Sequence, residues 1–210
     1  MHPMKRFAAA LFTLFVVSSL ASVASAEIPP LLREATHKMW ASGALGPLVG
    51  VRNGRIDVST GFGSVEAEVE PPGQFGFYQT FGLHFSGPAG PAIAFDLQEG
   101  FGDDAITFIM MPKFVYDIRI VPGLGLYLSP MAGLGFALIA PDDCPQGAEC
   151  DSSKGATFQT AFEGKLILGD RGMVFFRPFQ LEFLFMDLPG ADQMVTLVRY
   201  GLMFGGGVIF

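Results

Sequence analysis

Residues 193–210, the end of the chain, read QMVTLVRYGLMFGGGVIF. Counting back from Phe210 to Val198, every second residue is apolar or glycine, whereas the intervening set is mostly small and contains one charge, Arg199. Successive side chains of a β-strand point to opposite faces, so this pattern is typical of a strand with lipid on one side and a crowded barrel interior on the other. The stretch therefore predicts a membrane-spanning strand.

Seven further segments share this period of two, and with the last one they predict eight strands. A chargeless run over residues 120–141 is long enough for a transmembrane helix, but its prolines, its glycines and its alternation favour a strand. Short turns alternate with longer loops, as in barrels whose periplasmic turns are short, so both ends are expected in the periplasm. The predicted fold is all-β: a single transmembrane antiparallel up-and-down β-barrel of eight strands, with ten as the alternative. The seven segments are residues 55–69, 75–86, 91–99, 105–120, 120–141, 157–168 and 173–186.

The region before the predicted barrel divides into two parts. Residues 1–26 have a basic start, an apolar run and a small-x-small cleavage pattern, which predict a secretory signal peptide. Residues 27–54 are expected to be a periplasmic lead-in, with a short amphipathic helix over residues 30–41. Residues 45–52 also look like a strand, but including them would give an odd count, which single-chain bacterial barrels avoid. The barrel is therefore expected to span residues 55–210.

The terminal strand resembles the C-terminal assembly signal of bacterial outer-membrane β-barrels. The chain as a whole is similar in pattern to their small eight-stranded members, of the outer-membrane protein A, X and W types. This resemblance implies a place in the cell outer membrane, contact with outer-membrane lipid and recognition by the outer-membrane insertion machinery. The positions that carry the signal are Tyr200, Leu202, Phe204, Gly205, Val208 and Phe210.

With the apolar face toward lipid, the polar face of each strand points inward and carries charges of both signs. An eight-stranded barrel has room only for its own side chains or a small ligand, and an unpaired desolvated charge costs several kcal/mol. We therefore expect a salt-bridged plug in which Arg199 faces Glu182, with a narrow conduit for small or hydrophobic solutes as the alternative. Asp57 adds an acid near the periplasmic rim. The predicted network consists of Asp96, Lys113, Asp117, Arg119, Glu163, Lys165, Glu182 and Arg199.

Arg177 does not fit this division of faces, because the alternation places it on the lipid side. Near the inner interface an arginine can extend its charged end to water at small cost. A β-bulge near Pro178 is the other explanation.

The predicted external loops are polar and acidic. Cys144 and Cys150 lie six apart in one of them, and in an exported protein this spacing predicts a disulfide-closed loop. The segment has too few nitrogen and sulfur ligands for a metal site. Clustered carboxylates attract divalent cations such as calcium, but no calcium-loop spacing is present, and solvated loops are the favoured interpretation. The same acidity excludes nucleic acid as a partner.

His84 and Ser86 superficially resemble part of a catalytic site. His84 and Ser86 lie two apart on a predicted strand, and some small barrels of this class are lipid-modifying enzymes with a serine, a histidine and an acid. The pair is predicted to face inward beside a periplasmic turn, away from the outer leaflet. We therefore predict a non-enzymatic protein without a cofactor, in a structural or surface-interaction role, with a lipid-modifying enzyme as a weaker alternative.

Overall fold

The computed structural model describes residues 38–60, 63–86, 89–102, 105–121, 125–141, 152–169, 171–187 and 194–210. Within these ranges every regular element is a β-strand. No helix in this part of the chain is long and apolar enough to cross a membrane. The strands are β1 (Met39–Arg52), β2 (Gly54–Thr60), β3 (Gly63–Val69), β4 (Gln74–His84), β5 (Gly90–Phe101), β6 (Ala105–Val121), β7 (Leu126–Pro141), β8 (Ser153–Leu168), β9 (Gly172–Asp187) and β10 (Val195–Ile209).

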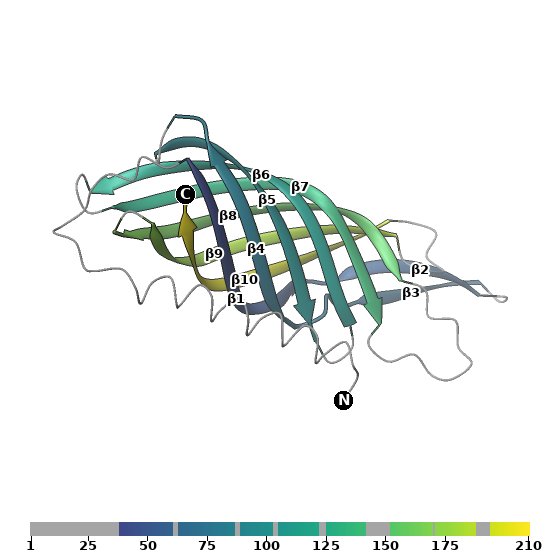
Figure 1. Cartoon of the computed structure of the whole chain (residues 1–210). Coiled ribbons are helices and arrows are strands. Elements are labelled where there is room, and N and C mark those ends of the chain that lie inside the picture. The colour runs from purple at the N-terminus through teal and green to yellow at the C-terminus, as the bar shows by residue number, and fades with distance from the viewer. Residues whose placement is uncertain are drawn as a thin grey trace.

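Eight of these strands form one closed barrel in the order β1-β10-β9-β8-β7-β6-β5-β4, and every neighbouring pair is antiparallel. The remaining two, β2 and β3, form a separate hairpin that projects beyond the barrel at the right of Figure 1. The prediction of an all-β, antiparallel, eight-stranded up-and-down barrel is confirmed.

The identity of the first barrel strand differs from the prediction. β1 pairs with β10 through Gly43 and Gly206 and with β4 through Gly43 and Gln79, so it closes the barrel. The predictions that residues 27–54 are only a lead-in and that the last strand closes against residues 55–69 are wrong. The prediction excludes the strand-like residues 45–52 because it counts residues 55–69 as one barrel strand, which makes the total odd. The first part of β1, residues 39–44, gives no signal, because its residues are small or apolar on both faces. Alternation cannot be recognised where the two faces do not differ.

Residues 55–69 instead make most of the projecting hairpin. Their pairing runs from Gly54 opposite Val69 to Thr60 opposite Gly63. Asp57, expected near the periplasmic rim, lies opposite Glu66 in this hairpin, so that prediction is also wrong.

The two ends of the barrel differ in their connections. Met39 and Phe210 lie at one end, where the backbones of the two residues hydrogen-bond to each other at 3.1 and 2.8 Å. The connections β4–β5, β6–β7 and β8–β9 at this end are short, whereas the hairpin and the long β7–β8 connection lie at the other. Outer-membrane barrels have short periplasmic turns and longer extracellular loops. We therefore name the two ends the periplasmic end and the hairpin end, and the latter faces outward.

Large apolar side chains cover the outside of the barrel wall. Phe81, Phe114 and Phe204 are each about half exposed, at 49%, 52% and 55% of their surface. Charged side chains of the same strands, such as Lys113 and Arg199, are buried inside. This arrangement is the inverse of a soluble barrel and matches a barrel surrounded by lipid.

Three predictions fall largely outside the described residues. The signal peptide over residues 1–26 and the Cys144–Cys150 disulfide both lie outside them and stay predictions. Of the helix predicted over residues 30–41, only the end is described, and Met39–Ala41 belongs to β1.

Candidate functional site: the barrel interior

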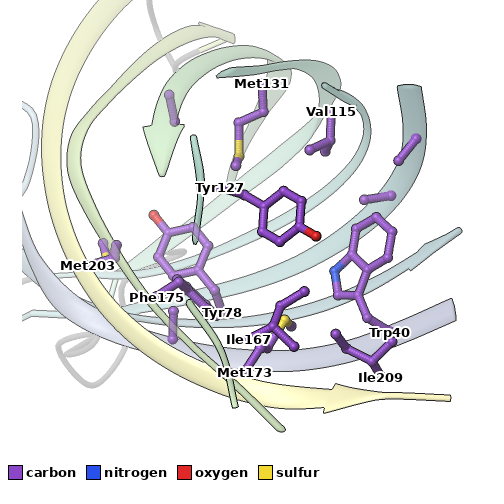
Figure 2. Close-up of a cluster of buried hydrophobic side chains, with 14 of the residues drawn as sticks. Trp40, Tyr78, Val115, Tyr127, Met131, Ile167, Met173, Phe175, Met203 and Ile209 are labelled. Carbon is purple, nitrogen blue, oxygen red and sulfur yellow. The ribbon is translucent and has the colours of Figure 1, made fainter. Parts of the chain in front are cut away.

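Two clusters of apolar side chains fill the ends of the barrel. The larger contains Trp40 from the start of β1 and Ile209 from the end of β10, so it lies toward the periplasmic end. Figure 2 shows how its side chains converge on the barrel axis from strands all around the wall. The smaller cluster includes Leu184 from the end of β9 and Val195 from the start of β10, toward the hairpin end. Buried polar and charged side chains occupy the space between the two clusters.

Arg199 and Glu182 form the ion pair nearest to the hairpin end. Both are completely buried, and they lie directly opposite each other on β10 and β9. The guanidinium donates to Oε2 of Glu182 from Nη2 at 2.6 Å and from Nε at 3.1 Å. Its Nη1 donates across the barrel to Oε1 of Gln74 on β4 at 2.6 Å and to Oγ1 of Thr107 on β6 at 3.3 Å. One arginine thus joins four strands.

The second oxygen of Glu182 continues the network toward the barrel centre. Its Oε1 accepts from the Gln159 amide at 2.7 Å and from the Tyr78 hydroxyl at 3.3 Å. Oε1 of Gln159 in turn accepts a hydrogen bond from Lys113, which also pairs with Asp96. The chain of contacts therefore crosses from β9 through β8 and β6 to β5.

A β-bulge in β9 brings Arg177 into this interior. Gln180 pairs with Gly201 of β10 and Arg177 with Met203, so three residues of β9 oppose two of its neighbour, and the same shift occurs against β8. The extra residue changes the phase of the alternation, and Pro178 and Phe179 are both exposed. Arg177 is 2% exposed and donates to Oε2 of Glu163 at 3.0 and 3.3 Å.

The expected position of Arg177 on the lipid face is therefore wrong, and the alternative of a bulge near Pro178 is correct. Phe175, which shares the parity of Arg177, belongs to the buried periplasmic cluster.

Asp117 organises the periplasmic side of the network. Its carboxylate accepts from Nζ of Lys165 at 2.9 and 3.1 Å and from the Ser129 hydroxyl, and Nε2 of His84 lies 2.7 Å from Oδ2. The His84 ring also packs on Trp40, with ring centroids 4.6 Å apart. Lys165 lies over the same indole, 5.2 Å from its centroid. On the periplasmic side the polar network therefore ends at the Trp40 ring.

Charges inside the described barrel balance. The buried acids are Asp96, Asp117, Glu163 and Glu182, and the buried bases are Lys113, Lys165, Arg177 and Arg199. Seven of the eight residues predicted for the network are in this set. The eighth, Arg119, is only half-buried near the periplasmic end, where its guanidinium lies 6.0 Å from the ring centroid of Tyr127. Arg177 is the fourth buried base in place of Arg119. The predicted network therefore lacked Arg177 and included Arg119, which is only half-buried.

One cavity of the interior is small. It lies between Trp40, Asp96 and Lys165, and its volume of about 10 Å³ is the size of a single water molecule. Several buried polar atoms have no hydrogen-bond partner in the described structure: Nδ1 of His84, Oδ1 of Asp96, both amide atoms of Gln98 and Oγ1 of Thr157.

His84 and Ser86 do not form a surface constellation. His84 is buried and bound to Asp117, whereas Ser86 is exposed beyond the end of β4. Among the described residues, no group of three or more His, Cys, Asp or Glu side chains could hold a metal ion.

The residues of the predicted assembly signal lie on the outside of β10 or at its end, except Gly205, which faces the interior. Phe204 stacks on Phe176 of β9 with centroids 4.5 Å apart, and Phe210 is 53% exposed at the periplasmic rim. The Tyr200 hydroxyl donates to the backbone carbonyl of Pro178 in the bulge. Gly205 lies against Phe175 and the backbone of Gly43, where a side chain would overlap both. The remaining signal positions, Leu202 and Val208, are partly buried.

No family model and no curated protein matches the sequence. The fold is similar to two solved structures. One is Neisserial surface protein A, with a TM-score of 0.57 and 11% identity over 82% of this chain and 97% of that one. The other is the N-terminal β-barrel domain of Pseudomonas aeruginosa OprF, with a TM-score of 0.52 and 13% identity over 83% and 98% of the two chains. At such identities the likeness concerns the fold alone.

Proposed function

We propose that this chain, an eight-stranded β-barrel of the outer-membrane type, is a non-conducting membrane protein with a structural or surface-interaction role. In this proposal the barrel is a rigid anchor, and the residues beyond the membrane at the hairpin end make the functional contacts.

The paired interior is the observation that carries the proposal. Four buried acids and four buried bases balance one another. The ion pairs Arg199–Glu182 and Arg177–Glu163 join neighbouring strands, and Lys165–Asp117 joins β8 to β6. Apolar clusters fill both ends. An ion passing through would have to separate buried pairs, and removing one partner of such a pair costs about 3–5 kcal/mol. The cavity of about 10 Å³ between Trp40, Asp96 and Lys165 has no room for a hydrated ion.

The projecting hairpin supports an interaction role. β2 and β3 pair only with each other, so the ribbon extends past the barrel wall (Figure 1). Glu66 and Glu68 are exposed on it. Exposed, charged and projecting elements are the part of a barrel that a soluble partner meets first.

A liposome-swelling assay tests the proposal. Vesicles that carry the folded barrel are diluted into an isotonic solution of a small sugar, with a wide porin as the positive control. We expect the swelling rate of protein-free vesicles. Swelling at the rate of the porin would overturn the proposal.

A narrow conduit is the second candidate function, and one observation favours it. Asp96, Gln98 and Thr157 present buried polar atoms without partners toward the interior. Such atoms are most often satisfied by water, and a short file of water is the minimum that a conduit needs. This candidate predicts slow swelling that stops when Gln98 is replaced by leucine, whereas the plug predicts no swelling in either protein.

We also propose that the outer-membrane insertion machinery recognises β10. The exposed Phe210 at the periplasmic rim supports this proposal. Deletion of Phe210 should slow assembly in cells but leave refolding into pure lipid vesicles unchanged. Equal assembly rates in cells would contradict it.

A further inference from the structure

A cleft of about 810 Å³ lies at the hairpin end, where the chain leaves β1, enters β2 and passes the start of β10. β1 ends with an irregularity between Gly50 and Arg52, and the ribbon then diverges from the barrel wall. Gly54 fits closely against β10, since a Cβ atom there would lie 2.1 Å from Cγ1 of Val195. The cleft is lined by Val51, Arg52, Asn53, Gly54, Arg55, Glu68, Met194, Val195 and Thr196.

The cleft lies at the depth of the lipid headgroups. From Met39 at the periplasmic rim to Val51, the outward side chains of β1 are apolar or glycine, and the first charge is Arg52. Twelve residue steps of ~3.3 Å, along a strand tilted by ~40°, rise about 30 Å, which is close to the thickness of the hydrocarbon layer. Val49 and Val51, exposed at 55% and 60%, are therefore in the acyl region, and Arg52 emerges just above it.

Two arginines flank the fixed Gly54. Arg52 and Arg55 both line the cleft and are exposed. Two acids lie beside them. Glu68 accepts a hydrogen bond from the Asn53 amide at 3.0 Å. Glu66 pairs with Arg55 at 3.4 Å, and the side chains of Glu66 and Arg55 are both mostly exposed. An exposed pair of this length contributes at most about 1 kcal/mol, so Arg55 can exchange it for a better anion.

We propose that this cleft binds the phosphate group of an outer-leaflet lipid. Arg52 and Arg55 donate to the phosphate oxygens, and the first part of the acyl region packs on Val51 and Met194. Guanidinium groups match phosphate geometry with two parallel hydrogen bonds. Arg52 and Arg55 are the two cations that line the cleft, and Glu68 is the one acid in its lining, so the lining has a net positive charge. The bound lipid would hold the base of the hairpin against the barrel.

Native mass spectrometry of the detergent-solubilised full chain tests the proposal. The probes are diphosphorylated lipid A, its dephosphorylated form and inorganic phosphate. The variants are the double substitution Arg52→Gln/Arg55→Gln, the single substitution Arg52→Gln, and Lys154→Gln as the matched control. Lys154 is a cation at the start of β8, opposite Asp187 of β9, and it is not part of the lining of the cleft. Heat-modifiable migration on gels checks that each variant is folded.

The expected result is lipid A binding about tenfold weaker in the double variant and unchanged in Lys154→Gln, with the dephosphorylated lipid bound weakly by all proteins. The single variant should lie between the double variant and the unaltered chain, and it keeps the test decisive if the double variant does not fold. Equal lipid A binding by the arginine variants, or an equal loss in Lys154→Gln, would overturn the proposal. So would inorganic phosphate that competes fully with lipid A at similar concentrations, because the site would then be one for a soluble anion.

Discussion

Arg199 and Glu182 face each other across the strand pair next to the closure of the barrel, and the guanidinium donates to one carboxylate oxygen from both Nη2 and Nε. The same arginine reaches Gln74 on the opposite side of the closing strand β1. Arg199 thus spans the seam where the first and last strands meet, and it links closure of the barrel to filling of its interior.

Breaking this pair from one side should be costly. Glu182→Ala leaves Arg199 buried and without its counter-charge, and we expect a loss of about 3–5 kcal/mol in the free energy of unfolding. The double substitution Glu182→Leu/Arg199→Met removes both charges and should recover most of that loss. Urea unfolding in lipid vesicles measures the three values. A single variant as stable as the unaltered chain would show that the pair is not buried as described.

The sign of the change in unfolding free energy caused by Arg177→Leu distinguishes the two positions considered for this residue, the barrel interior and the lipid face. Facing Glu163 inside the barrel, Arg177→Leu should destabilise the protein by about 3–5 kcal/mol, because it leaves the carboxylate unpaired. On the lipid face the same change would stabilise it, since a lipid-exposed arginine costs up to about 2–4 kcal/mol near the bilayer midplane. The sign of the change in unfolding free energy is the readout, and stabilisation would contradict the bulge.

Removing the hairpin tests which segment is the first barrel strand. Replacing residues 54–69 by a short Gly-Ser linker should leave a folded, heat-modifiable barrel, because β2 and β3 are not part of the closed sheet. Deleting residues 39–52 should abolish folding, because β10 and β4 would lose their shared partner. If the hairpin deletion fails to fold and the β1 deletion folds, the strand order is wrong.

Trp40, the only tryptophan of the chain, lies flat on Gly82. A Cβ atom at Gly82 would lie about 2.0 Å from the indole, so Gly82→Ala must displace the ring, at a cost of about 1–3 kcal/mol. Tryptophan emission should shift, since the ring leaves its contacts with His84 and Lys165. Gly164→Ala is the control, because its nearest neighbour would be 3.8 Å away. Identical spectra for all three proteins would refute this packing.

Most of the fold could be predicted from the sequence because its physical cause is local. Lipid outside and packed side chains inside impose a period of two, and segments such as 105–120 and 157–168 show it clearly. β1 could be recognised only in part, over residues 45–52, because its faces are both small or apolar and its place in the barrel depends on partners about 35 and 160 residues away. The clear alternation in residues 55–69 belongs to a two-stranded ribbon, which has two distinct faces without being part of the barrel.

The inward charges could be predicted for the same reason, with one exception. Asp117 and Lys165 lie on regular stretches of their strands, so counting by two places them inside. Arg177 lies next to a bulge, and one extra residue reverses the faces beyond it. Pro178 was the available signal, since proline within a sheet is tolerated at bulges and edges. The hydrogen-bond partners of the inward side chains, such as Gln74 for Arg199, depend on how the barrel closes, and no local sequence pattern predicts them.

Single-channel recording in planar bilayers tests the central claim, that the interior is a closed plug, most directly. The unaltered protein should give no steady conductance in salt, because an ion would have to separate the buried ion pairs and pass the apolar clusters. Glu182→Ala should give brief openings if it folds, since it frees Arg199 from its main partner. Steady, large currents through the unaltered protein would contradict the account.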